Sequence, residues 1–159
     1  MRQELIKIRD KERWTIKEPV AYDHIRIKDG FFFHHAIYKS DSDVYHMTYE
    51  DGDIFGHKGY FEICNLDQFQ RNQKIEVRLY SIEEKAKLLN HSEVDNRLSD
   101  ILGEVYYDLL LSNCEHYINH ITLNEFVSYQ VQQLINEPIR DKDNKGINQI
   151  LGSVFNMIK

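Results

Sequence analysis

The sequence is poor in cysteine and has no long apolar run. Cys64 and Cys114 are its two cysteines, too few for the disulfide framework that holds small secreted domains together. No stretch reaches the roughly 18 consecutive apolar residues that a membrane-spanning helix needs, and Met1–Leu5 does not open an apolar secretory signal. We therefore expect a cytoplasmic protein that keeps its thiols reduced and has no transmembrane segment.

The chain also lacks an excess of positive charge. Its 20 Lys and Arg residues face 26 Asp and Glu residues, for a formal net charge of −6. Nucleic-acid-binding proteins normally carry a basic patch, so we expect no nucleic-acid partner. The same balance gives no general attraction to anionic membrane surfaces. An apolar fraction of 42% and an aromatic fraction of 12%, without any internal repeat, instead predict one packed domain.

The apolar patterns place strands first and helices afterwards. Strand-like runs lie at residues 22–28, 31–38, 43–49, 60–64 and 74–79, and helical patterns lie at residues 65–69, 82–89, 93–111 and 113–135. This order predicts an α+β domain in which an antiparallel sheet packs against helices. We expect the domain at residues 18–137, after a polar N-terminal extension at residues 1–17.

Residues 138–159 are expected to form a charged linker and a C-terminal amphipathic helix. Apolar side chains recur there at the i, i+3, i+4, i+7 spacing of one helical stripe: Ile147, Ile150, Leu151, Val154, Phe155 and Ile158. Such a helix packs on its own domain or on a second copy of the chain, which would make a homodimer. Peripheral contact with a membrane is the alternative, although such helices usually carry Lys and Arg along the polar face.

Cys114 lies in what the sequence predicts to be the first turn of a helix. Ser112 is the expected N-cap, with Glu115 three residues later as its capping-box partner. The unpaired N–H groups and the positive end of the helix dipole favour an anion there by about 0.3–2 kcal/mol, and the thiolate is the nucleophilic form of cysteine. The alternative is that Cys114 is a small buried core residue, as free cysteines usually are. Cys64, in a strand-like run, is expected to be a core filler.

Two histidines on neighbouring strand-like runs are candidate bases. If Tyr38 faces Val44 across a hairpin, then Ala36 faces His46, and His34 lies diagonally to His46 on the same face of the sheet. His35 then points to the other face, where we expect a packing role. A base oriented by a second polar group is the usual arrangement for activating a nucleophile. A buried histidine that only hydrogen-bonds to the main chain is the alternative for His34.

Metal binding is not expected from the eight histidines. His116 and His120 have the i, i+4 spacing of a helical ligand pair, but a zinc site needs three or four ligands. Cys114 falls on a different face of the same helix, and no Cys-x-x-Cys motif accompanies the pair. We therefore predict no metal and no cofactor.

Several segments, taken in order, resemble the lecithin:retinol acyltransferase family. These segments are Asp23-His24-Ile25, His34-His35-Ala36-Ile37-Tyr38, Val44-Tyr45-His46, Leu102-Gly103-Glu104 with Tyr107, Asn113-Cys114-Glu115-His116-Tyr117, and Ser128-Tyr129-Gln130-Val131. The resemblance implies a permuted papain-like thiol fold over about residues 18–135. It also implies that Cys114 is the nucleophile, His34 the general base and His46 the third polar residue.

The resemblance further implies an acyltransferase or phospholipase that takes a phospholipid or another acyl ester as substrate. Cys114 would carry the acyl group as a thioester, and the start of its helix, at Asn113 and Cys114, would support the oxyanion. Two alternatives stay open, because motif retention does not prove turnover. One is a non-catalytic interaction module with the same motifs, and the other is a thiol amidase or peptidase.

Overall fold

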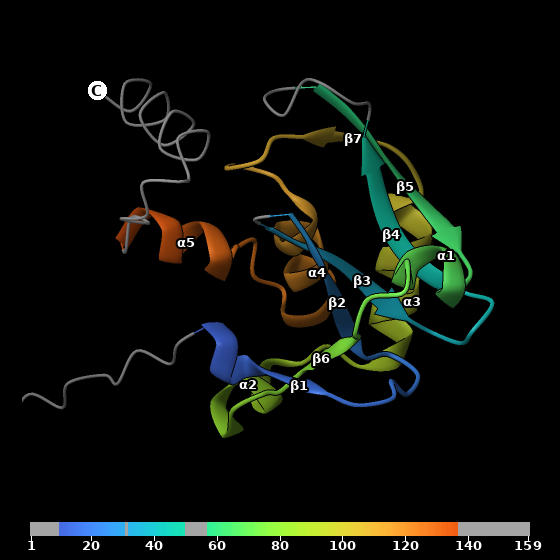
Figure 1. Ribbon diagram of the computed structural model, residues 1–159. Coiled ribbons are helices and arrows are strands. Elements are labelled where there is room, and N and C mark those ends of the chain that lie inside the picture. Colours follow the sequence, from blue (N-terminus) through green and yellow to red (C-terminus); the bar gives the residue numbers. More distant parts are fainter. Residues whose placement is uncertain (1–9, 31, 50–56, 137–159) are drawn as a thin grey trace, which may run out of the picture. The chain divides into compact units, whose positions relative to one another are not determined.

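The computed structural model describes residues 10–30, 32–49 and 57–136 (Figure 1). The expected linker and C-terminal helix beyond residue 137 lie outside this part of the chain. The chain divides into two compact units, Met1–Ser128 and Tyr129–Lys159. The second contains the helix α5 (Tyr129–Asn136). The sheet and the helices α1–α4 belong to the first unit.

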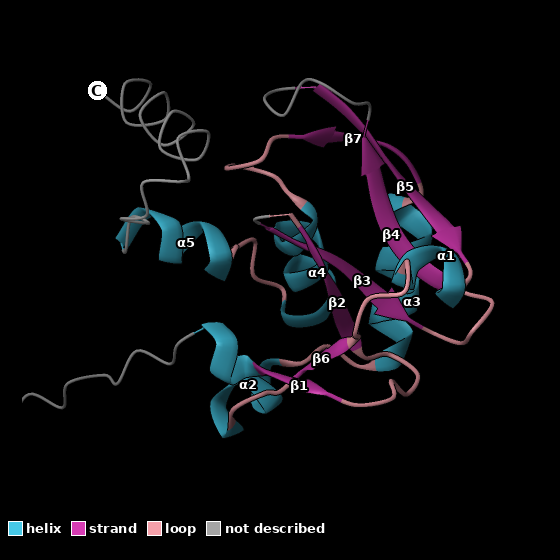
Figure 2. Ribbon diagram, viewed as in Figure 1, coloured by secondary structure: helices cyan, strands magenta, loops and turns pink. Residues whose placement is uncertain are grey.

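The first unit is built on a seven-stranded antiparallel sheet, which confirms the expected α+β class. Its strands follow one another in space as β1-β6-β2-β3-β4-β5-β7 (Figure 2). Their bounds are Trp14–Ile16 for β1, His24–Asp29 for β2, Phe32–Tyr38 for β3, Val44–Tyr49 for β4, His57–Cys64 for β5, Glu76–Arg78 for β6 and Gly103–Tyr107 for β7.

The central position of β3 follows from its composition. Its aromatic and β-branched residues suit a pleated strand, and four consecutive residues, His34–Ile37, are buried, as expected for a strand covered on both faces. β3 and β4 form the expected hairpin, in which Ala36 pairs with His46 and Tyr38 with Val44. The structure adds the short strand β1, which pairs with β6 through Trp14 and Arg78 and was not predicted from the sequence.

The helices of the first unit are short, and most begin at a side-chain cap. Asn65 caps α1 and Ser81 caps α2 with complete capping boxes, and Asn90 caps α3. The Ser81 box was expected from the sequence. The bounds are Asp10–Arg13 for the 3-10 helix η1, Leu66–Gln70 for α1, Ile82–Lys87 for α2, His91–Ile101 for α3 and Cys114–Leu123 for α4.

Two helices end earlier in the structure than the sequence predicted. The helix predicted at residues 93–111 ends at Ile101, because Leu102 has ψ 133° and Gly103 has φ 111°, a conformation that only glycine adopts readily. The chain then forms β7 along β5. The helix predicted at residues 113–135 ends at Leu123, where Asn124 adopts the left-handed conformation with φ 58°.

Two apolar clusters cover the two faces of the sheet. Helices α3 and α4 pack on one face, where the cluster includes Ile37, Leu98 and Ile118. Helix α1 packs on the other face through Phe69, beside Ala36. Along β3, successive side chains therefore enter different clusters, and His34 and His35 lie on opposite faces.

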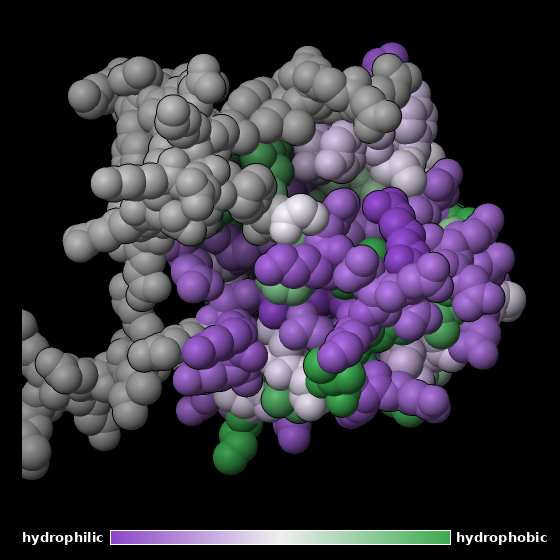
Figure 3. All heavy atoms as spheres, in the orientation of Figure 1, coloured by the Kyte–Doolittle hydropathy of each residue, from purple (hydrophilic) through white to green (hydrophobic). Residues whose placement is uncertain are grey.

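The surface of the described part is mainly hydrophilic on the face drawn in Figure 3, where apolar side chains form separate small areas. This distribution is usual for a protein surface. Within the described residues, none of the helices has the length and apolar character needed to cross a membrane.

Candidate active site

Helix α4 begins at Cys114, and its N-cap is Asn113 rather than the expected Ser112. The Asn113 Oδ1 atom accepts from the His116 N–H at 3.2 Å, and the Asn113 N–H donates to His116 Nδ1 at 3.0 Å. His116 therefore takes the capping-box position that we expected Glu115 to fill. Ser112 instead pairs through its main chain with Asp108 in the preceding turn.

The Asn113 side chain also holds the loop before the helix. Its Nδ2 atom donates to Leu109 O at 2.9 Å and to Ser128 Oγ at 3.3 Å. Asn113 is only 3% exposed, so both ends of its amide are used inside the protein. Its side chain thereby fixes the position of Cys114, the first residue of the helix.

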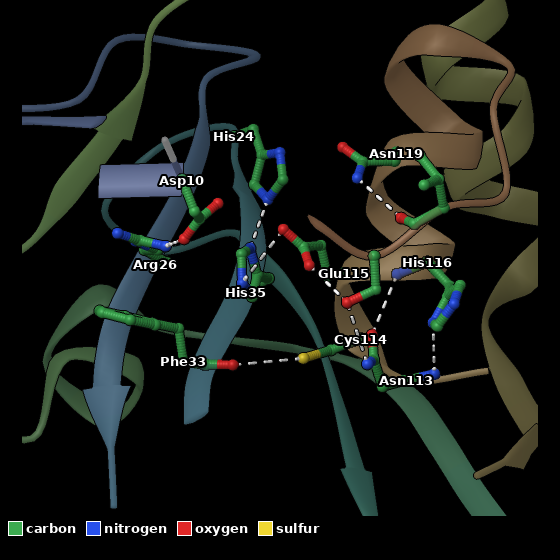
Figure 4. Close-up of polar contacts among 12 residues, drawn as sticks. Asp10, His24, Arg26, Phe33, His35, Asn113, Cys114, Glu115, His116 and Asn119 are labelled. Carbon is green, nitrogen blue, oxygen red and sulfur yellow. Dashed lines mark hydrogen bonds and ion pairs between the residues drawn. The ribbon is translucent and has the colours of Figure 1, made fainter. Parts of the chain in front are cut away.

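The Cys114 sulfur lies against the main chain of β3 (Figure 4). It contacts Phe33 O at 3.7 Å, and the residue is partly buried. Burial raises the pKa of the Cys114 thiol to about 12, while the main-chain N–H groups of His35, Glu115 and Cys114 itself lower it. These N–H groups surround the sulfur with donors, but burial dominates, and the thiol is neutral at pH 7.

The sulfur reaches this position because β4 separates from β3. Tyr38 N donates to Asp23 O and Tyr38 O accepts from Tyr22 N, so the main-chain groups of Tyr38 point toward β2. Main-chain groups alternate along an antiparallel strand, so those of His35 and Phe33 point toward the β4 side. Within residues 32–49, β4 pairs with β3 only at Ala36–Tyr38, and the two strands then diverge (Figure 1).

His34 and His46 meet as the sequence predicted. His34 Nε2 lies 3.0 Å from His46 Nδ1, and the His34 ring packs on Phe69 with ring centres 5.2 Å apart. Burial, followed by the charge of His46, lowers the pKa of His34 to about 3. Burial also lowers the pKa of His46, against an opposing effect of Glu62. Both rings are therefore neutral at pH 7, and His34 can accept a proton.

The relation between Cys114 and His34 is indirect in this structure. Among the described residues, the sulfur contacts the main chain on either side of His34 and has no hydrogen bond to its ring. The His34 Nε2 atom is engaged by His46, which leaves Nδ1, the ring nitrogen nearer to the main chain. His34 Nδ1 is thus the ring nitrogen closer to the part of β3 that the Cys114 sulfur contacts.

His35 occupies the opposite face in a sealed polar network (Figure 4). His24 Nε2 lies 2.7 Å from His35 Nδ1, and His35 Nε2 lies 3.9 Å from Glu115 Oε2. Ser128 Oγ donates to Glu115 Oε1 at 2.5 Å. His35 is 0% and Glu115 is 1% exposed, and the ring of Trp14 meets both histidines edge-on. This placement agrees with the packing role expected for His35.

Sequence reasoning missed most of this network. Glu115 was assigned to the capping box, and His24 was given no partner. The signal for His24 lies in the sheet register: it pairs with Ile37, and His35 pairs with Arg26, so the two histidines are diagonal neighbours on one face. The β2–β3 register is needed to see this, and it joins strands whose pairing the periodicity alone does not specify.

The helical pair His116 and His120 has other roles. Burial lowers the pKa of His116 to about 4, so its neutral ring can accept the Asn113 N–H in the capping box. His120 lies 3.3 Å from an Arg97 nitrogen. The described residues contain no group of three or more His, Cys, Asp or Glu side chains arranged to hold a metal ion.

Comparison with known proteins gives the family of the chain. The profile of the family described as lecithin retinol acyltransferase matches residues 17–127, more than half of the chain and the whole of the Cys114–His34 region. The chain belongs to the lecithin retinol acyltransferase family. Phospholipase A and acyltransferase 3 from Homo sapiens is 28% identical over an alignment of 140 positions, which covers 77% of this chain and 82% of the human protein. The protein of the same name from Pongo abelii matches with the same values.

Proposed function

We propose that this member of the lecithin retinol acyltransferase family is a cysteine-dependent acyltransferase or phospholipase. It takes an acyl group from a phospholipid or another ester donor and carries it as a thioester on Cys114. The observation that carries the proposal is the Cys114 sulfur at the start of α4, against the β3 main chain that flanks His34. The 28% identical human relative, phospholipase A and acyltransferase 3, supports the class of reaction.

Proton transfer accompanies the attack in this mechanism. The high pKa of the thiol and the low pKa of His34 favour the neutral pair, so a preformed thiolate–imidazolium pair is not the resting state. His34 Nδ1 takes the S–H proton as the sulfur bonds to the ester carbonyl carbon. The carbonyl oxygen becomes an oxyanion, which the N–H groups at the start of α4 stabilise, and Asn113 supports it by capping the helix.

The intermediate then releases the alcohol. The C–O ester bond breaks, the His34 imidazolium returns its proton to the leaving alkoxide, and the acyl group stays on the Cys114 sulfur. His46 holds the His34 ring through the 3.0 Å contact during both steps. Water as the second substrate makes the enzyme a phospholipase, whereas an alcohol or amine makes it an acyltransferase.

This proposal includes a permuted papain-like arrangement for the catalytic domain at residues 18–137. Its support is a thiol at a helix start packed on the sheet that carries the histidine. Proteases with this arrangement cleave amide bonds with the same kinds of group: a thiol, a base and main-chain N–H donors.

The test is intact-mass measurement after incubation with vesicles of phosphatidylcholine and phosphatidylethanolamine. We expect the wild type to gain the mass of one fatty acyl group, which neutral hydroxylamine removes, and Cys114→Ala to gain none. Cys64→Ala is the matched control. Cys64 is the other free cysteine, also partly buried, and burial raises the pKa of its thiol to about 11.

An adduct that persists in Cys114→Ala, or that is lost only in Cys64→Ala, contradicts the proposal. Wild-type protein that neither gains an acyl group nor releases fatty acid favours the interaction module. Cleavage of a peptide panel in place of lipids favours the amidase.

A further inference from the structure

A carboxylate completes the row of polar side chains that begins at His34. Glu62 on β5 lies directly opposite His46 on β4 in the sheet register. Paired residues of neighbouring strands share a face, so Glu62 lies on the face of His34 and His46. Its Oε1 atom is 3.4 Å from His46 Nε2. Three residues from three adjacent strands therefore form one line: Glu62, His46 and His34.

His46 Nε2 has no hydrogen-bond partner among the described residues, although it is buried. Glu62 is the carboxylate next to it, at a distance slightly beyond an ordinary N–H···O hydrogen bond. Hydrogen bonds of catalytic groups are often long in ligand-free structures and shorten when substrate binds. The Glu62 side chain is 53% exposed, so it has room to approach His46.

The chemistry of the row allows two directions of hydrogen bonding between the histidines. In one, His34 Nε2–H donates to His46 Nδ1, which leaves a lone pair on His34 Nδ1. In the other, His46 Nδ1–H donates to His34 Nε2, and the hydrogen then sits on His34 Nδ1, where no base remains. Without a third group, neither neutral arrangement is selected.

Glu62 selects between these two arrangements. A carboxylate accepts hydrogen bonds and repels a lone pair, so it favours the His46 form with its hydrogen on Nε2. His46 Nδ1 is then the acceptor, and His34 must donate from Nε2. The arrangement that remains has the His34 Nδ1 lone pair available to the Cys114 thiol.

We propose that Glu62 is a positioning residue that sets the tautomer of His46 and, through it, exposes the Nδ1 lone pair of His34. The inference rests on the proposed function, since it assigns Glu62 to the same proton transfer. In that step the Cys114 S–H bond breaks, the proton goes to His34 Nδ1, and Glu62 stays a carboxylate throughout. Its negative charge stabilises the imidazolium that forms in the row.

The charged groups around the pair act in opposite directions. Glu62 on β5 raises the pKa of His46, whereas Arg71, which follows α1, lowers the pKa of His34 and of His46. Arg71 also pairs with Asp29 at 3.8 Å, at the end of β2. Removal of the Glu62 charge therefore takes away the group that raises the pKa of His46.

The first experiment measures phospholipid cleavage by Glu62→Gln across pH 5–9 in phosphatidylcholine micelles. We expect kcat to fall on the order of 10-fold with KM unchanged. This is less than the ~10⁴-fold lost when a buried triad aspartate is replaced, because Glu62 is half exposed. The loss of kcat should be the same from pH 5 to pH 7, because the pKa of His34 is about 3 and the base stays neutral over that range. Glu62→Asp, which keeps the carboxylate, should restore part of kcat.

Glu104→Gln is the matched control. Glu104 lies on the same face of the sheet on β7, opposite Tyr60, and its side chain is 56% exposed with Lys58 at 3.7 Å. This variant should leave kcat and the pH profile unchanged. Equal kcat and pH profiles for Glu62→Gln and wild type, with Cys114→Ala inactive, overturn the Glu62 inference and leave the proposed function intact.

The second experiment does not depend on turnover. Long-range ¹H–¹⁵N spectra of imidazole nitrogens should show His34 and His46 of the wild type at pH 7.5 with hydrogen on Nε2. In Glu62→Gln, the two rings should become a mixture of tautomers. Hydrogen on His34 Nδ1 in the wild type, or an unchanged pattern in Glu62→Gln, overturns the inference even if the protein proves inactive on every lipid.

Discussion

His34 and His35 are neighbours in sequence but belong to two different environments. His34 lies on the face of α1, 8% exposed, in a row that ends at the half-exposed Glu62. His35 lies on the face of α4, 0% exposed, in a network with His24 and Glu115. Burial lowers the pKa of both rings, so both are neutral at pH 7.

The two environments differ in what each ring nitrogen can do. Both nitrogens of His35 face partners, His24 at Nδ1 and Glu115 at Nε2. Of the two His34 nitrogens, Nε2 faces His46, and Nδ1 is left for a reaction. A low pKa therefore does not identify the base. A neutral imidazole becomes a general base when one nitrogen is held by a partner and the other is left free.

The largest effect on activity should come from substituting His34, and the matched substitution of His35 should affect stability instead. His34→Gln should lower the rate of phospholipid cleavage by about 10²–10⁴-fold, the usual contribution of a general base. Its free energy of unfolding should change little, because glutamine can still reach His46. His35→Phe should instead lower the free energy of unfolding by about 1–3 kcal/mol, since it leaves His24 and Glu115 buried without their partner.

Rates and urea midpoints of both variants check this prediction. His46→Ala serves as the intermediate case and should slow cleavage less than His34→Gln does. If His35→Phe is as inactive as His34→Gln while it is equally stable to urea, the roles of the two faces are reversed.

Lowering the pH should destabilise the protein, because histidines on both faces of the sheet are buried in the neutral form. The pKa of His24, His34, His35, His46 and His116 is lower in the folded protein than the ordinary value of about 6.5. The unfolded chain therefore binds more protons below pH 6.5, and stability is fully present above that pH. Below it, each fully buried histidine costs about 1.4 kcal/mol per pH unit until its folded pKa is reached.

Urea unfolding at pH 7.5, 6.5 and 5.5 measures this loss. The fall in stability between pH 6.5 and 5.5 should be smaller in His35→Phe and in His34→Gln than in the wild type, because each variant removes one such group. Stability that stays constant down to pH 5.5 contradicts the neutral, buried state of both histidines.

The smallest effect should come from the helix caps on the two faces. Asn113→Ala, at the start of α4, should cost about 1–2 kcal/mol, because the side chain is buried and also holds Leu109 and Ser128. Asn65→Ala, at the start of α1, should cost about 0.5–1 kcal/mol, because that cap is exposed. Thermal unfolding of both variants gives the difference, and equal losses would show that the extra Asn113 contacts add nothing.

The features that the sequence predicted correctly are local. They are the β3–β4 hairpin, the Ser81 capping box and the helix start next to Cys114. Each depends on residues within about ten positions of one another, so the spacing of those residues is enough to predict the local structure. The errors arose where two local patterns compete. Val105 continues an apolar helical pattern, but Gly103 ends the helix, and the segment gains more from pairing with the edge of β5.

The sequence by itself determined the class of the fold, the family and the pairing of His34 with His46. Only the tertiary structure decided that β4 separates from β3 and admits the Cys114 sulfur, and that Glu62 stands opposite His46. The physical reason is the range of the interactions. Turns and caps are encoded by neighbours along the chain, whereas a strand register that joins distant segments is selected by the packing of the whole sheet against its helices.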